Sequence, residues 1–267
     1  MKKTLLAVAL AASALSGQAL AWTNGSTGGS FELGGTFIAE ALPTQVWEAE
    51  LGQSPVLDAD FNNKDTTVII PVMADIPVLG MRVADTGGLI QPVTGSTNNP
   101  EIKYSGGYDV AALSNGVGSV MLDVIDAGSN TKIGTLEAKL TTAALGSQKN
   151  NTATTAAVRS IFADNAGNPR VFKNGVSSTA GGAIQTPSEV KALITKMFPD
   201  ALTNFNDQSG TEASVAQAQN FNISTATHSG AYASGIESGS DITISLDTPL
   251  SADTKWKASF PIIISYL

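Results

Sequence analysis

Alternation of apolar and polar residues in short runs is the feature that most restricts how this chain can fold. In residues 117–125, every second side chain from Val120 onward is aliphatic. Successive side chains of a strand point to opposite faces of a sheet, so such a run buries one face and exposes the other. Similar runs, each bounded by Gly, Asn, Asp, Ser or Pro, lie at residues 66–71, 76–83, 132–140, 241–246 and 255–266. We therefore predict an all-β sandwich.

The first 21 residues have the parts of a secretory signal peptide in the required order. Lys2 and Lys3 form a positively charged start, residues 5–15 form an apolar run, and Ala21 ends a small-x-small cleavage signal. We predict cleavage between Ala21 and Trp22, followed by export of the mature chain. The apolar run is too short to cross about 30 Å of hydrocarbon, which argues against a membrane anchor.

Charge and cysteine content exclude several classes of function. The chain carries 15 Lys and Arg against 23 Asp and Glu, for a formal net charge of -8, and it has no cysteine. Nucleic acid binding draws most of its affinity from a basic surface, so we exclude nucleic acid as a partner. The lack of cysteine excludes disulfides, thiolate nucleophiles and cysteine-based metal sites. Its hydrophobic content of 42% is enough to build a core.

Residues 143–222 differ in character from the rest of the chain. They are rich in Ala, Asn, Thr and Ser and contain one clear helix signal, in which Thr186 caps the helix, Pro187 is its first residue and Glu189 completes a capping box. We predict a helix that ends before Pro199 and a second, weaker helix over residues 155–163. We interpret the whole segment as an insertion carried on the β scaffold, where binding surfaces are often found.

No pattern for catalysis or metal binding is complete. His228 is the only histidine and has no nucleophile-elbow or zinc-ligand spacing around it. Asp58 and Asp60 begin a run like a calcium loop, but the sixth position is Asn63 and the twelfth is Ile69, where such a loop needs Gly and Glu. We predict no enzyme activity, no cofactor and no metal. A secreted hydrolase that uses His228 is kept as an alternative, and so is an outer-membrane β-barrel.

Two strand-like segments lie at the two ends of the mature chain. Near the N-terminus, the odd-numbered positions from 27 to 37 hold Thr27, Gly29, Phe31, Leu33, Gly35 and Phe37. At the C-terminus, alternation places Phe260, Ile262, Ile264 and Tyr266 on one face of a strand that stops at Leu267. A long apolar strand at a sheet edge promotes aggregation unless another segment covers it.

The chain resembles the major subunits of chaperone–usher fimbriae, and among them the FaeG-like subunits of enterotoxigenic Escherichia adhesive fimbriae. The residues that carry this resemblance are the signal peptide, the Trp22 start, Leu33-Gly34-Gly35-Thr36-Phe37, Trp47-Glu48, Thr254-Lys255-Trp256 and Ile264-Ser265-Tyr266. Both ends match well, whereas the middle third matches only in general character. The lack of cysteine also fits the FaeG-like branch.

The resemblance implies an immunoglobulin-like sandwich that lacks its last strand. A periplasmic chaperone would first fill the resulting groove, and the N-terminal extension of the next copy would then replace it by donor-strand exchange. In this interpretation Phe31, Leu33 and Phe37 enter successive pockets, and Gly29 and Gly35 suit shallow ones. The C-terminal strand would form one wall of the groove and the chaperone-binding edge, and the Leu267 carboxylate would meet a chaperone cation.

The resemblance also implies the division of the chain and its partners. Residues 1–21 would be the signal peptide, 22–40 the donor extension, 41–142 and 223–267 the sandwich, and 143–222 an insertion that binds host glycoconjugates. The expected partners are other copies of the chain, a periplasmic chaperone, an outer-membrane usher and a host glycoconjugate receptor. The expected location is a fimbrium on the bacterial surface, reached through the periplasm. A minor subunit of the same fimbriae is the nearest alternative.

Overall fold

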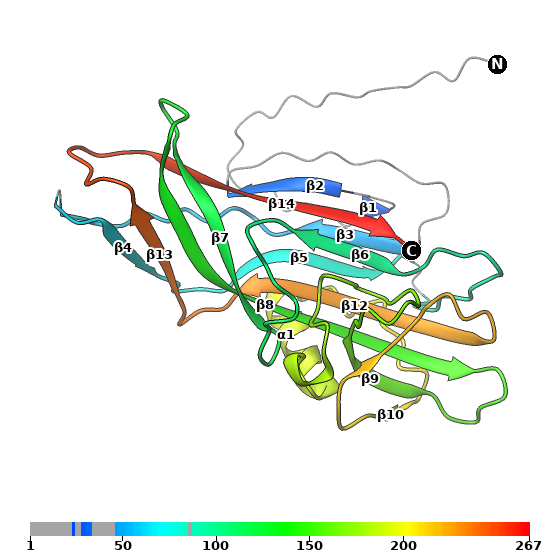
Figure 1. The fold of residues 1–267 in the computed structure, drawn as a ribbon. Helices are drawn as coiled ribbons and strands as arrows, with labels where there is room; N and C mark the ends of the chain where they lie inside the picture. Colours follow the sequence, from blue (N-terminus) through cyan, green and yellow to red (C-terminus); the bar gives the residue numbers. More distant parts are fainter. Residues whose placement is uncertain (1–22, 25–27, 34–45, 63, 85–86) are drawn as a thin grey trace, which may run out of the picture.

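The computed structural model describes residues 23–24, 28–33, 46–62, 64–84 and 87–267. Strands dominate this part of the chain, and they are accompanied by one α-helix, α1 (Pro187–Met197), and one 3-10 helix, η1 (Ala180–Gly182) (Figure 1). The strands are β1 (Thr23–Asn24), β2 (Gly28–Leu33), β3 (Trp47–Leu51), β4 (Thr67–Pro71), β5 (Ile76–Val83), β6 (Pro100–Tyr104), β7 (Val117–Asp126), β8 (Lys132–Asn150), β9 (Ala157–Phe162), β10 (Thr211–Glu212), β11 (Gln217–Ala218), β12 (Ala226–Ile236), β13 (Asp241–Leu246) and β14 (Trp256–Tyr266). The predicted all-β class is confirmed.

The strands form one curled sheet whose main path is β1-β3-β5-β12-β8-β7-β14-β2. Strand β8 makes the curl possible because it is 19 residues long and has different neighbours along its length. Its first part pairs with β7 and β13, and its last part pairs with β12 and β9. β4 pairs with β13 beyond this path (Figure 1). The two halves of the sheet therefore share one long strand and face each other across a common core.

The core lies between the two halves of the sheet. Leu79 of β5 and Leu136 of β8 belong to the same buried apolar cluster as Phe260 of β14. Trp47 is a fully buried member of this cluster, with its ring 5.2 Å from that of Phe172 and 5.9 Å from that of Phe221. Each large side chain buried in this way contributes about 1.5–3 kcal/mol to the free energy of folding. Residues from the segment 143–222 thus complete the core of the sandwich itself.

Helix α1 has the start and the buried face that its sequence predicts. The Thr186 hydroxyl accepts a hydrogen bond from the Glu189 N–H at 3.4 Å, and the Glu189 carboxylate accepts one from the Thr186 N–H at 3.2 Å. The buried face packs on the outside of β8 and β12, where Ala143, Ala231 and Ala233 let the helix approach closely. The side chains of this face are Val190, Leu193, Ile194 and Met197.

Two predictions for the segment 143–222 are wrong. The expected helix over residues 155–163 is strand β9, which pairs with β8 from Ala157 opposite Gln148 to Ser160 opposite Leu145. A short run with β-branched Val158 and Ile161 does not by itself distinguish a helix from a strand. Pairing with the edge of β8 therefore determines its conformation. The strand expected over residues 132–140 also continues into this segment, because β8 reaches Asn150. Alternation is lost there since residues 140–147 are buried on both faces.

Candidate functional site

The C-terminal strand β14 is the part of the fold most suited to binding another strand. Ala258, Phe260, Ile262 and Ile264 are buried on its inner face, whereas Ile263 on the other face is 54% exposed. One edge of β14 is paired with β7 at residues 256–258 and with β6 at residues 262–266. In the described part of the chain, the opposite edge is paired only with β2, at residues 258–263. Completion of the sheet at β14 therefore depends on one short N-terminal segment.

The floor beneath β14 is aromatic and tightly hydrogen-bonded. The ring of Phe260 stacks on Tyr104 with 5.4 Å between the ring centres. The Tyr104 hydroxyl lies 2.8 Å from that of Tyr232 and 2.6 Å from that of Ser234, and Tyr232 also donates to the carbonyl of Gly175 at 2.9 Å. Burial raises the pKa of Tyr232 well above its usual value, so this hydroxyl stays neutral. The network fixes the groove floor without placing a charge in it.

The antiparallel register between β2 and β14 is the central geometric fact of the site. Gly29 is paired with Ile262, Phe31 with Phe260, and Leu33 with Ala258. The predicted odd-numbered face of the N-terminal segment is thus opposite the buried face of β14. The even-numbered positions are opposite residues outside that face, namely Ser259, Pro261 and Ile263. Thr27, Gly35 and Phe37 lie outside the described residues, as do Ala21 and Trp22 of the predicted cleavage site.

Tyr266 and Leu267 end the chain beside a cluster of asparagines that sequence reasoning missed. Tyr266 is partly buried, and its position pairs with Pro100 of β6. The Leu267 N–H donates to the Asn99 carbonyl at 2.9 Å, and the Asn222 side chain donates to the Leu267 oxygen at 2.8 Å. The Asn98 N–H donates in turn to the Asn222 side chain at 2.6 Å. The end of the segment 143–222 therefore holds the end of the chain in place.

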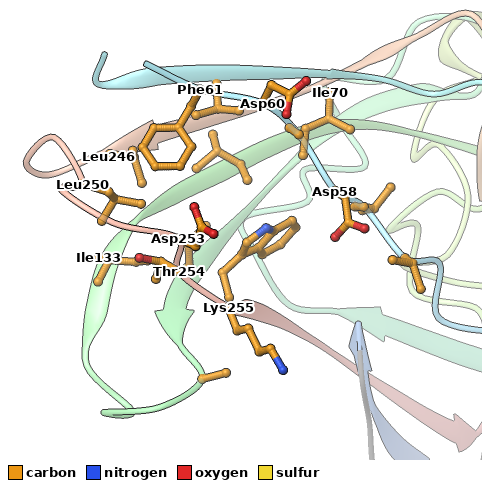
Figure 2. A pocket seen from close by; sticks show the side chains of 18 of the residues that line it. Asp58, Asp60, Phe61, Ile70, Ile133, Leu246, Leu250, Asp253, Thr254 and Lys255 are labelled. Carbon is orange, nitrogen blue, oxygen red and sulfur yellow. The ribbon is translucent and has the colours of Figure 1, made fainter. Parts of the chain in front are cut away.

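A cavity of about 660 Å³ opens at the start of β14. Its inner wall comes from five strands of the curled sheet, through Val68 and Ile70 of β4, Val124 of β7, Ile133 of β8, Ile244 and Leu246 of β13 and Trp256 of β14. The loop of residues 55–61 and the segment 253–255 complete it. Figure 2 shows Phe61, Leu246 and Leu250 gathered on one side and the Lys255 amine pointing away. Most of the inner wall is apolar, whereas Asp58, Asp60 and Asp253 are exposed at the rim.

His228, Asp58 and Asp60, the candidates for catalysis or metal binding, do not form a site in the structure. His228 is fully buried in β12 and stacks on Phe221 with 4.9 Å between the rings. Loss of solvation on burial lowers the pKa of His228 to about 4, and the nearby Arg159 charge acts in the same direction. Asp58 and Asp60 belong to the cavity rim. Within the described residues, no group of His, Asp and Glu side chains could hold a metal ion, and no helix is long and apolar enough to cross a membrane.

Together, the curled sheet and the N-terminal strand paired at its last edge define an all-β protein whose sheet edge is suited to strand addition. The family model described as "Fimbrial, major and minor subunit" of the K88 type matches residues 1–267, and the chain belongs to this family. Curated relatives from Escherichia coli include K88 fimbrial protein AB, 29% identical over 292 residues, and K88 fimbrial protein AC, 29% identical over 298 residues. K88 fimbrial protein AD from the same species is 27% identical over 292 residues. Each alignment covers 100% of both chains.

Family membership confirms the resemblance read from the two ends of the sequence. The protein is a structural subunit of a cell-surface fimbrium, where fimbrial subunits polymerise with one another, and it is not an enzyme. The alternative of a secreted hydrolase is thereby excluded, in agreement with the buried position of His228.

Proposed function

We propose that this chain polymerises by donor-strand exchange, in which the N-terminal segment of one copy pairs with β14 of the next. The pairing of β2 with β14 carries this proposal. In the sequence, the 12 residues 34–45 lie between β2 and Val46, where the body of the sandwich begins. A pairing made within one chain through such a connection can also be made between chains, which is the principle of domain swapping. Each copy then supplies one strand and receives one.

The energy of exchange comes from main-chain hydrogen bonds and apolar burial. Adding a strand to a sheet edge pairs the N–H and C=O groups that the edge would otherwise leave open. Burial of Phe31 and Leu33 against β14 would contribute roughly 1.5–3 kcal/mol each, before the entropy of ordering the segment is subtracted. Without an incoming strand, the edge of β14 from Ala258 to Ile263 would lie open. A periplasmic chaperone that fills this edge until an outer-membrane usher joins the copies fits that requirement.

Deletion of residues 22–37 tests the proposal directly. The truncated chain should still form a complex with a periplasmic chaperone, since β14 is intact, but it should not polymerise. A synthetic peptide of residues 22–38 added to this complex should displace the chaperone and yield a heat-resistant subunit–peptide complex. A truncated chain that is folded, monomeric and as stable as the full chain without any added strand would contradict the proposal.

We also propose that the fimbria adheres to host-cell glycoconjugates through the segment 143–222. Its support is the position of α1 from this segment, which packs on β8 and β12 in a second buried cluster around Val190 and Ile194, separate from the main core. Such a rigid display suits a binding surface. Purified fimbriae built of this chain should bind members of a panel of host glycolipids. A minor subunit of the fimbria is the nearest alternative, and it predicts only a few copies of this chain per fimbria. Fimbriae built of this chain that bind none of the panel would contradict the adhesive role.

A further inference from the structure

A second cavity, of about 410 Å³, lies between the C-terminal end of α1 and the strands β3 and β5. On β3, Trp47 and Leu51 are buried, whereas Glu50 has the opposite parity and lines this second cavity. Gly80 of β5 is paired with Glu50, and a Cβ atom added at Gly80 would lie 2.7 Å from the ring of Phe198. The end of the helix therefore covers the outward face of β5 beside Glu50.

Carboxylates give the second cavity an acidic lining, and the adjoining cations are already paired. The carboxylates that line it are Glu50, Asp75 and Asp200. Arg82 Nε lies 2.9 Å from the Glu48 carboxylate, and Lys196 Nζ lies 2.9 Å from that of Asp75. Within the described residues, the Glu50 carboxylate makes no hydrogen bond or ion pair. Loss of solvation raises the pKa of Glu50, with the Arg82 charge acting against this shift and the Asp200 charge adding to it. A cation beside Glu50 would offset the lost solvation.

Strand β1 leads the N-terminus of the mature chain to the second cavity. β1 pairs antiparallel with β3, and Thr23 is opposite Ala49. One further step in the same register places position 22 opposite Glu50. Residues directly opposite each other in an antiparallel pair share a face, so a side chain at position 22 lies on the outward face together with Glu50. This position holds Trp22, which is the first residue of the mature chain if the signal peptide is cut after Ala21 as predicted.

We infer that the second cavity is the binding site for the first residue of the mature chain: the Trp22 indole enters it, and the α-ammonium group of Trp22 pairs with the Glu50 carboxylate. The apolar walls that suit an indole are formed by Pro55, Pro77 and Pro199. Cleavage of the signal peptide frees an α-amino group whose ordinary pKa is about 8, so it is cationic at neutral pH. An uncleaved chain has an uncharged peptide N–H at this position. Cleavage thus supplies the cation that the acidic lining lacks.

Acylation of the α-amine tests the ion pair. Purified fimbriae are treated near neutral pH with a limiting amount of an N-hydroxysuccinimide ester, and mass spectrometry of the N-terminal peptide gives the reaction rate at Trp22. Pairing with Glu50 keeps the amine protonated and unreactive, so the wild-type rate should be on the order of tenfold below that of Glu50→Gln. Glu137→Gln is the matched control, because it makes the same chemical change at an exposed strand position on β8 and should leave the rate unchanged.

Tryptophan fluorescence tests the position of the indole. The chain has three tryptophans, so the emission that is lost on Trp22→Phe substitution belongs to Trp22. This emission should be blue-shifted, and acrylamide should quench it several-fold less than it quenches the same residue in a synthetic peptide of residues 22–38.

Three results would overturn the inference: equal acylation rates in wild type and Glu50→Gln, quenching of Trp22 as strong as in the peptide, or a mature chain that begins at another residue. None of them bears on donor-strand exchange, because β1 and β3 pair within one chain and residues 28–33 are unchanged in every variant. Leu33→Asp, in contrast, disrupts the β2 ladder alone, so the two proposals fail separately.

Discussion

Phe260 of β14 lies directly opposite Phe31 of β2 in an antiparallel ladder that joins the two ends of the chain. The residues are more than two hundred positions apart in sequence, and both are phenylalanines. Beneath Phe260, Tyr104 and Tyr232 form a buried hydroxyl pair, so the ladder lies on a floor that cannot easily rearrange. The edge of β14 is thus rigidly supported at the position where it pairs with β2.

Leu33→Asp is expected to weaken the joining of subunits strongly. Position 33 is opposite buried Ala258, and a carboxylate there loses about 2 kcal/mol of apolar burial and adds the cost of burying a charge. Together these terms should lower affinity by at least about a hundredfold. Polymer yield and heat resistance in detergent gels measure the effect.

Ser30→Asp is the matched control for that variant. Position 30 is opposite Pro261, outside the buried face of β14, so this carboxylate can stay in water. Polymers should form nearly as well as in wild type. Equal loss in the two variants would show that charge in the segment, and not its inward face, determines joining.

His228 should make the subunit less stable as pH falls from about 6.5 to 4. Burial holds the folded-state pKa at about 4, while an unfolded chain binds the proton near 6.5. Between these values the unfolded state carries more protons than the folded state, so the free energy of unfolding decreases as pH decreases, by about 3 kcal/mol across the window. Urea unfolding of the strand-complemented subunit at several pH values measures it. His228→Gln should flatten this part of the profile, and an unchanged slope in that variant would contradict the assignment.

Thr186→Ala should cost about 1 kcal/mol of stability because it removes the N-cap of α1. The Glu189 N–H then loses its acceptor, and the reciprocal contact of the capping box is weakened. Thr186→Ser keeps the hydroxyl and should retain most of the stability. The helix packs on β8 and β12 away from β14, so polymer formation should be unaffected by either change. Thermal unfolding and detergent gels, run side by side, check both expectations.

The strands with one buried face could be predicted from sequence almost to the residue. β13 has the bounds that alternation indicated and β7 ends one residue beyond them, since each alternates between buried and less buried positions over most of its length. The second part of β8 was missed because Ala143, Leu145 and Ser147 are buried together with their neighbours, which erases the period of two. β9 was mistaken for a helix because its partner strand, and not its composition, determines its conformation.

Other parts of the site were beyond sequence reasoning for a different reason. The asparagine cluster joins Asn98 to Asn222, which are 124 positions apart, and no local pattern marks such a pairing. The cavity needs five strands and a loop to come together before it exists. Periodicity indicates which face of a strand or helix is buried. It does not indicate where the packing between the two halves of the curled sheet leaves a cavity.

Cysteine cross-linking tests the central claim most directly, because the chain has no cysteine of its own. Glu32 is opposite Ser259 in the ladder, a spacing at which a disulfide can form. The double variant Glu32→Cys with Ser259→Cys, assembled on cells and oxidised, should give a ladder of covalent multimers on non-reducing gels. Mixed chains with one cysteine each should give covalent dimers. If the double variant instead yields only internally cross-linked monomers, β2 completes its own chain and donor-strand exchange between copies is contradicted.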